Sequence, residues 1–152
     1  MFMKRAPTYI LTFLFALYLA GVLYVVFFAW NYGSSLGAGG PGGRNVNLEV
    51  WKSIHTIAVY SPGIRDPLVI LGGNILMFTP FGFLLYFLLN QTGLRSFIIV
   101  SAGACCFSVF IEVNQYVFTY RVANIDDVLL NTAGALIGWL AAACLNRVMK
   151  GR

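Results

Sequence analysis

Four long apolar runs, separated by short polar segments, constrain the fold of this chain more than any other feature. They span approximately residues 8–30, 67–89, 96–120 and 128–145, and only the third contains a charged side chain. A helix needs about 20 apolar residues to cross the roughly 30 Å of hydrocarbon in a bilayer, and each run approaches that length. Within hydrocarbon, a helix satisfies its own backbone hydrogen bonds. The sequence therefore predicts an all-α integral membrane protein with four transmembrane helices.

The composition supports one membrane domain covering residues 1–152. Hydrophobic residues make up 59% of the chain and charged residues only 10%. A soluble domain of this size could not bury so much apolar surface, so the bilayer must act as its solvent. The net charge of +5 is explained by basic residues that flank the spans, and we expect no nucleic-acid partner.

The distribution of Lys and Arg predicts the orientation of the chain. With four spans, both termini lie on the same side of the membrane as the short loop at residues 90–95. That side carries more basic residues than the other and no acidic ones, so the positive-inside rule places both termini in the cytoplasm. The basic residues on that side are Lys4, Arg5, Arg95, Arg147, Lys150 and Arg152.

The first external loop has two parts of different character. Residues 33–43 are rich in Gly and Ser, a composition typical of a flexible linker. Apolar residues then recur at helical spacing over residues 46–59, which predicts an amphipathic helix in the outer interface with Trp51 as its anchor. His55, the only histidine in the chain, falls in this segment, and no second histidine exists to share a metal ion.

Polar side chains occur at a similar depth in three of the spans. An ionisable residue at mid-membrane costs about 2.5–3.5 kcal/mol on insertion scales, so Glu112 indicates function more than packing. With a rise of about 1.5 Å per residue, Asn74, Glu112 and Asn131 all lie near the external surface. We predict one polar site open to the outer leaflet. Its candidate ligand-binding residues are Asn74, Glu112, Gln115, Arg121, Asp126, Asp127 and Asn131.

The polar residues of the last two spans also share helix faces. Steps of three and four residues place them on one side of each helix, and we expect the two stripes to meet. The stripe of the third span contains Ser101, Cys105, Ser108, Glu112 and Gln115, and that of the fourth contains Asp127, Asn131, Gly134 and Gly138.

Four residues are candidates for helix packing. Gly134 and Gly138 form a Gly-x-x-x-Gly pair, which permits close approach of two helices. Pro80 removes a backbone donor and Gly82 leaves space, so we expect a kink in the second span.

Each polar residue also has a purely structural interpretation, which the sequence leaves open. Asp126 and Asp127 fit the start of a helix, where carboxylates cap the backbone and oppose the dipole. Arg121 could pair with these acids across a tight turn. Asn74 and Asn131 could join helices through hydrogen bonds worth about 0.6 kcal/mol each in membranes.

Taken together, these motifs resemble the VanZ-like membrane family. The resemblance covers about Asn47 to Leu145 and has two departures: family members often carry Asp near position 124, where this chain has Asn124, and a Pro-Phe pair where it has Glu49-Val50. The matching motifs are Asn47-Leu48, Gly73 to Phe83, Ile111-Glu112-x-x-Gln115, Arg121, and Ile125 to Gly138.

The resemblance implies a protein of the bacterial cytoplasmic membrane that contributes to tolerance of glycopeptides and lipoglycopeptides such as teicoplanin. The partner we expect is a membrane lipid, a lipid-linked cell-wall intermediate or the lipoglycopeptide itself, bound at the outer leaflet by a non-enzymatic module. We predict no cofactor and no metal ion, and homo-oligomerisation stays open.

Two alternative functions remain. One is an enzyme for undecaprenyl-type substrates that uses Glu112, Asp126 and Asp127 as acid–base groups or Mg²⁺ ligands. No phosphatase or nucleophile motif supports it. The other is a small assembly partner that recruits membrane proteins through Gly134 and Gly138.

Overall fold

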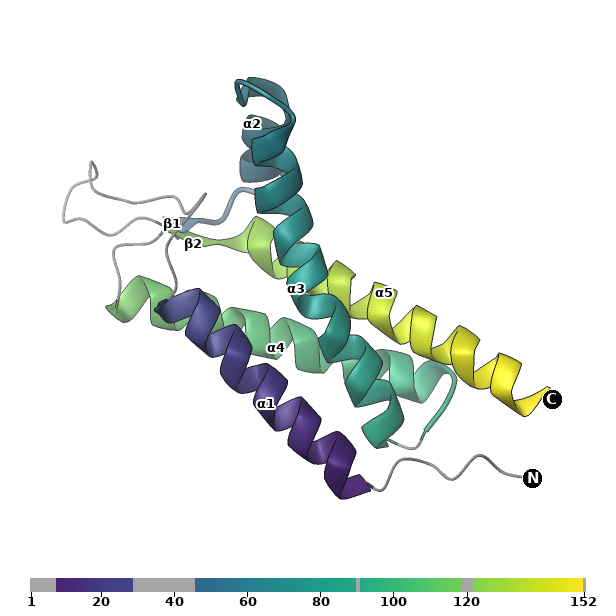
Figure 1. Ribbon diagram of the computed structural model, residues 1–152. Helices are drawn as coiled ribbons and strands as arrows, with labels where there is room; N and C mark the ends of the chain where they lie inside the picture. The colour runs from purple at the N-terminus through teal and green to yellow at the C-terminus, as the bar shows by residue number, and fades with distance from the viewer. Residues whose placement is uncertain (1–7, 29–45, 90, 119–121, 152) are drawn as a thin grey trace.

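Five helices and two short strands make up the described part of the chain (Figure 1), which in this computed structural model comprises residues 8–28, 46–89, 91–118 and 122–151. Four of the helices are long and apolar enough to cross a membrane, so the prediction of an all-α, four-span membrane fold is confirmed. The elements are α1 (Thr8–Phe27), β1 (Val46–Asn47), α2 (Lys52–Tyr60), α3 (Arg65–Leu89), α4 (Leu94–Phe118), β2 (Ala123–Asn124) and α5 (Ile125–Lys150). The Gly-rich loop predicted at 33–43 lies outside the described residues.

The last span is longer at both ends than the predicted range of 128–145. It begins at Ile125 because Asn124 caps it: the Asn124 side chain accepts a hydrogen bond from the Asp126 backbone N–H (3.2 Å). It continues into a last turn that carries Arg147 and Lys150, whose charges oppose the negative end of the helix dipole.

Helix α2 begins later than predicted, because the segment before it forms a strand. Val46 and Asn47 pair in parallel with Ala123 and Asn124 at the start of α5. The helix predicted from residue 46 therefore begins only at Lys52. None of its residues is buried, which agrees with a helix on the outside of the bundle.

The N-terminus of α2 is capped by Asp126, a residue in the first turn of α5. Trp51, which precedes α2, has a φ of 70°, an uncommon left-handed conformation, and makes no side-chain capping bond. Asp126 is fully buried and supplies the cap instead. Its Oδ1 accepts the N–H of Trp51 (2.6 Å), and its Oδ2 accepts those of Ser53 (2.8 Å) and Ile54 (3.2 Å). Asp126 thus fixes α2 against the start of α5.

Helices α3 and α5 make the closest contact in the bundle, and three glycines allow it. A Cβ at Gly82 would overlap the backbone of Ala135, and one at Gly134 would overlap the backbone of Ile75. A Cβ at Gly138 would likewise overlap the carbonyl of Thr79. These three positions therefore pack two helices of the same chain against each other. Helix α3 continues through Pro80.

The buried face of α4 differs from the predicted stripe in the first half of the helix. Cys105 is exposed, and Ser101 Oγ donates to the carbonyl of Phe97 in its own helix (2.8 Å), so the stripe predicted through these two residues is wrong there. Residues four apart form a ridge inclined to the helix axis, which is used when helices cross at an angle. The buried residues of α4 follow such a ridge through Ser96, Val100, Ala104, Ser108 and Glu112.

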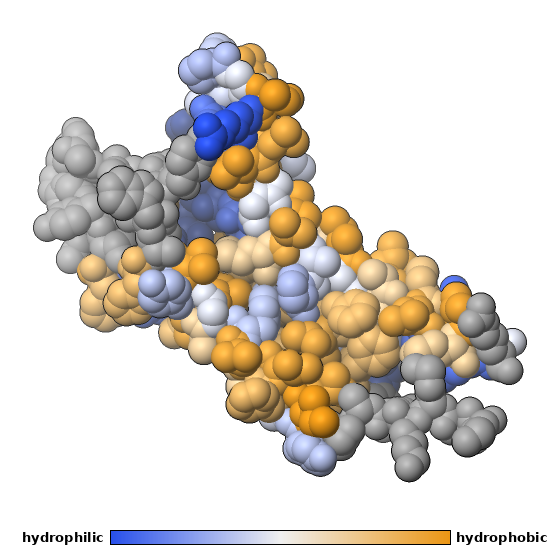
Figure 2. Space-filling model, in the orientation of Figure 1, coloured by the Kyte–Doolittle hydropathy of each residue, from blue (hydrophilic) through white to orange (hydrophobic). Residues whose placement is uncertain are grey.

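Helix α1 packs mainly on α3 and leaves most of its surface open. Only Val22 and Val26 are buried in it. Tyr18 Oη donates to the carbonyl of Met77 on α3 (2.8 Å), which fixes the middle of α1 to the bundle. Figure 2 shows hydrophobic residues over much of the visible surface of the long helices and hydrophilic ones near α2. This pattern suits contact with lipid on the long helices and with water at the α2 end.

The α3–α5 contact predicts an unequal response of two glycines to added side chains. Gly134→Val should destabilise the protein by about 1–3 kcal/mol or more, because overpacking here meets backbone rather than a movable side chain. Gly103→Ala on α4 is the control, since its Cβ would meet only side-chain atoms, the nearest at 3.7 Å. The thermal unfolding midpoint in detergent measures both. A Gly134→Val midpoint equal to that of Gly103→Ala would contradict the proposed contact.

The capping role of Asp126 predicts a local effect on α2. Hydrogen bonds to a charged group contribute about 1.5–3 kcal/mol, and Asp126→Asn removes the charge and one acceptor. The amides of Ser53 and Ile54 should then exchange their hydrogens about tenfold faster, the equivalent of about 1.4 kcal/mol. The matched variant Asp127→Asn, one residue away, should leave these rates unchanged. Equal exchange in the wild type and in Asp126→Asn would show that the cap contributes nothing.

Candidate functional site

A cavity of approximately 660 Å³ lies among helices α1, α3, α4 and α5, with Ile57 of α2 at its edge. Its lining comes from the second half of α1, the end of α4, the first half of α3 and the start of α5, so it occupies the end of the bundle opposite Thr8 and Gly151 (Figure 1). Two different walls line it: a polar wall mainly from α4 and α5, and an apolar wall mainly from α1 and α3.

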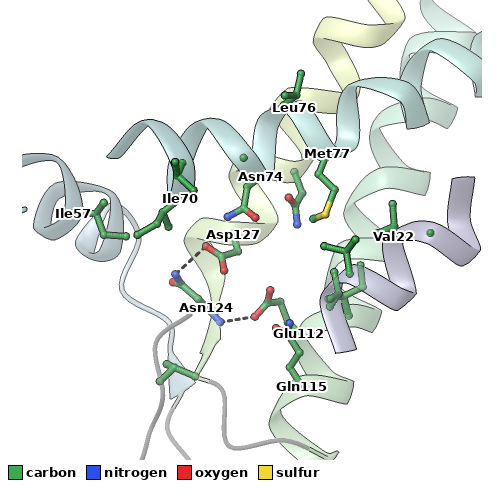
Figure 3. A pocket seen from close by; sticks show the side chains of 18 of the residues that line it. Val22, Ile57, Ile70, Asn74, Leu76, Met77, Glu112, Gln115, Asn124 and Asp127 are labelled. Atoms are coloured by element: carbon green, nitrogen blue, oxygen red, sulfur yellow. Dashed lines mark hydrogen bonds between the residues drawn. The ribbon is translucent and has the colours of Figure 1, made fainter. Parts of the chain in front are cut away.

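Five of the predicted site residues meet in the polar wall. Asn74 reaches it from α3, Glu112 and Gln115 from α4, and Asp127 and Asn131 from α5. Figure 3 shows the first four of these side chains converging from three helices. Glu112, Gln115 and Asn131 are largely inaccessible, with exposed fractions of 7%, 6% and 2%. The fold thus brings together amides and carboxylates that are distant in the sequence.

Asn124, which was not among the candidates, lies at the centre of this polar wall. Its side-chain Nδ2 donates to Asp127 Oδ1 (3.1 Å), while its Oδ1 accepts from Asn47 Nδ2 (3.1 Å) and from the Asp126 N–H. A carboxylate at this position could accept but could not donate to Asp127. The position directly before a helix with acids in its first turn is a preferred place for Asn, and that signal could have identified it.

Glu112 holds the start of α5 in place. Its Oε2 accepts the backbone N–H of Asn124 (2.8 Å), in the buried region where β2 leads into α5. The N-terminal end of a helix carries partial positive charge, so this position favours a carboxylate. Glu112, whose charge is unfavourable inside a membrane span, therefore bonds to the backbone of Asn124 and also lines the cavity.

Asn131 contributes an acceptor that the described residues do not satisfy. Its Nδ2 donates to Ser108 Oγ on α4 (2.8 Å), which joins the two helices. Its Oδ1 is buried and has no hydrogen-bond partner among the described residues. A buried polar atom without a partner costs about 1–3 kcal/mol, so the site gains stability when a donor reaches this oxygen.

The opposite wall is apolar and adjoins the lipid-facing surface. Val25 and Leu76 line the cavity, yet 51% and 72% of their surfaces are exposed. The wall thus extends from the interior to the outside of the bundle. Its other residues on α1 and α3 are Tyr18, Gly21, Val22, Val26, Val69, Ile70, Gly73 and Met77.

Two predicted site residues are not part of this lining. Asp126 lies behind it, with both carboxylate oxygens bonded to backbone N–H groups around the start of α2. It therefore caps a helix, as the structural interpretation allowed, although the helix is α2 and not its own. Arg121 lies outside the described residues.

The titratable side chains of the cavity lining are those of Tyr18, Glu112 and Asp127. Among the described residues that line it there is no Ser, Thr, Cys or His. Within the same described part of the chain, no three His, Cys, Asp or Glu side chains come close enough to bind a metal ion. His55 lies on α2, where its ring meets the edge of Tyr60 at a centroid distance of 6.0 Å.

Comparison with known proteins supports the family suggested by the motifs. The family model described as VanZ/LLP1 matches residues 15–146, a range that includes α3 and α4, most of α1 and α5, and all the residues that line the cavity. Comparisons with curated proteins and with solved structures give no significant match. Together with its four apolar helices, this match shows that the chain is a VanZ-like, multi-pass membrane protein that belongs to the VanZ/LLP1 family.

Proposed function

We propose that this protein binds a membrane amphiphile in the cavity at the outer-leaflet end of the bundle, and thereby contributes to tolerance of lipoglycopeptides such as teicoplanin. The observation that carries the proposal is the pairing of a polar wall on α4 and α5 with an apolar wall on α1 and α3. Ligand sites are concave and mostly apolar, with a few placed polar groups that set orientation, and typical volumes are about 300–1,000 Å³. A lipid-linked head group or an acylated glycopeptide has both required parts.

The assignment of this end to the outer leaflet is part of the proposal. Both termini of the described chain lie at the other end, together with the exposed residues Arg95, Arg147 and Lys150. Cytoplasmic ends of membrane proteins carry an excess of Lys and Arg. In the proposed orientation the cavity faces the external side of the bacterial cytoplasmic membrane, where cell-wall intermediates and glycopeptides are found.

Binding is favoured over the two alternatives by specific contacts. Both oxygens of Asp126 accept backbone N–H groups at α2, so this acid is not available to an enzyme mechanism. Glu112 also accepts a backbone N–H, that of Asn124. Gly134 and Gly138 contact α3 within the bundle, which leaves neither glycine to recruit another membrane protein.

Asn74→Leu tests the polar wall, with Asn114→Leu as its control. Asn74 lines the cavity, whereas Asn114 lies outside its lining on α4 and donates to Phe110 of its own helix (2.7 Å). In lipid nanodiscs, Asn74→Leu should bind fluorescent teicoplanin about tenfold more weakly, since losing one hydrogen bond and leaving its partner unpaired costs about 1–3 kcal/mol. Asn114→Leu should bind like the wild type.

The same variants give a cellular readout. Cells that express Asn74→Leu at the wild-type level should be more susceptible to teicoplanin, and cells with Asn114→Leu should not. Teicoplanin without its acyl chain should bind the wild type weakly, because it lacks the part that fits the apolar wall. Unchanged binding and susceptibility in Asn74→Leu would refute the role of this cavity.

A further inference from the structure

Two glycines face the cavity without any packing reason to be glycine. A Cβ at Gly21 of α1 or Gly73 of α3 would have no atom within 4 Å, and both residues line the apolar wall. In Gly82, Gly134 and Gly138, by contrast, a Cβ would overlap the backbone of the neighbouring helix. Glycine in a helix interior costs about 1 kcal/mol relative to alanine. At Gly21 and Gly73 the absence of a side chain, which carries this cost, leaves empty space beside the cavity.

The space beside these glycines lies between α1 and α3. Helix α1 is the least buried of the four spans, with 11% of its most apolar window buried. Its side-chain hydrogen bond to α3, from Tyr18 Oη to Met77 O, lies at the inner end of the cavity, one turn before Val22. The exposed residues Val25 of α1 and Val69 and Leu76 of α3 also line the cavity. The cavity is therefore open sideways, toward the lipid chains.

The polar wall supplies an independent indication of a ligand. Among the described residues that line the cavity, Asn131 Oδ1 is a buried acceptor without a partner, in a side chain that is only 2% exposed. Its amide is held by Ser108, so the oxygen has a fixed direction. A hydroxyl or amide N–H on a ligand would satisfy it.

We propose that the ligand enters the cavity sideways from the bilayer, between α1 and α3. Its hydrocarbon chain lies against Gly21 and Gly73, and a hydroxyl or N–H of its head group donates to Asn131 Oδ1. This inference rests on the proposed function and adds the ligand class and the route. The ligand is a lipid with a donor-bearing head group, and it enters laterally while its chain stays in the bilayer. Access from the external water is not required.

The test uses the full chain in vesicles of phosphatidylethanolamine and phosphatidylglycerol. Two photoreactive probes carry a diazirine in the middle of the hydrocarbon chain: a phosphatidylglycerol and a long isoprenyl phosphate with a sugar head group. Mass spectrometry then locates the labelled residues. We expect at least one probe to label the facing residues of α1 and α3, Val22, Val25, Val69 and Met77 among them. The more strongly labelling probe distinguishes a bulk phospholipid from a lipid-linked intermediate.

Neighbouring glycines provide a matched pair of variants. Gly73→Phe should fill the cavity and remove the labelling, whereas Gly72→Phe, which also has nothing within 4 Å but does not line the cavity, should retain it. Gly21→Phe, from the opposite helix, should act like Gly73→Phe and controls for a local folding defect.

A phosphatidylmethanol probe tests the head-group donor. It has the same chain as phosphatidylglycerol but lacks the hydroxyl donor, and it should label about fivefold less, the effect of one neutral hydrogen bond.

The outcomes separate this inference from the proposed function. If teicoplanin binding depends on Asn74 but neither probe labels α1 and α3, or Gly73→Phe labels like Gly72→Phe, then the ligand occupies the cavity without the lateral route and the inference is overturned. If Asn74→Leu leaves teicoplanin binding intact while the probes label these helices, the proposed role in teicoplanin tolerance fails and the lipid site in the cavity stands.

Discussion

The close backbone contact between α3 and α5 is the constraint on which the remaining structure depends. Gly82, Gly134 and Gly138 let the two helices approach until backbone meets backbone. This approach brings Asn74 of α3 to the same cavity wall as Asp127 and Asn131 of α5. Helix packing in membranes relies on such small residues, since lipid offers no hydrophobic drive for association. The glycines thus determine the geometry of a site whose polar atoms they do not touch.

A second set of interactions joins the polar wall to the segment that precedes α2. Asn124 donates to Asp127, accepts from Asn47, and presents its backbone N–H to Glu112. Next to it, Asp126 caps α2, so one short stretch connects the first loop, α4 and α5. Burying a polar group is favourable only when it is hydrogen-bonded, and here nearly every buried polar group bonds to a neighbouring residue. The exception among the described side chains of the cavity wall, the oxygen of Asn131, is where a ligand would gain most.

The parts of this architecture that depend on local sequence could be predicted, and the parts that depend on distant contacts could not. Apolar length identified four spans, and helical rise placed Asn74, Glu112 and Asn131 at one depth, because both signals reside within single helices. The start of α2 and the partner of Asp126 depend on residues more than 70 positions apart in the sequence. Local periodicity therefore extended α2 back to residue 46, through what is in fact a strand. The predicted buried stripe of α4 was wrong at Cys105 for a similar reason, because the angle at which α4 crosses its neighbours decides which face is buried.

The pairing of β1 with β2 and the bonds from Asp126 to the residues around the start of α2 have a consequence for biogenesis. A chain is made from its N-terminus, at about 5–20 residues per second, so α2 leaves the ribosome well before its cap does. Until α5 is synthesised, Trp51 and Ser53 lack the carboxylate that accepts their N–H groups. The end of the bundle that holds the cavity therefore matures last, after the fourth span has been synthesised. A truncation that stops translation before Ile125 would leave three spans and an α2 segment without the Asp126 carboxylate that caps it.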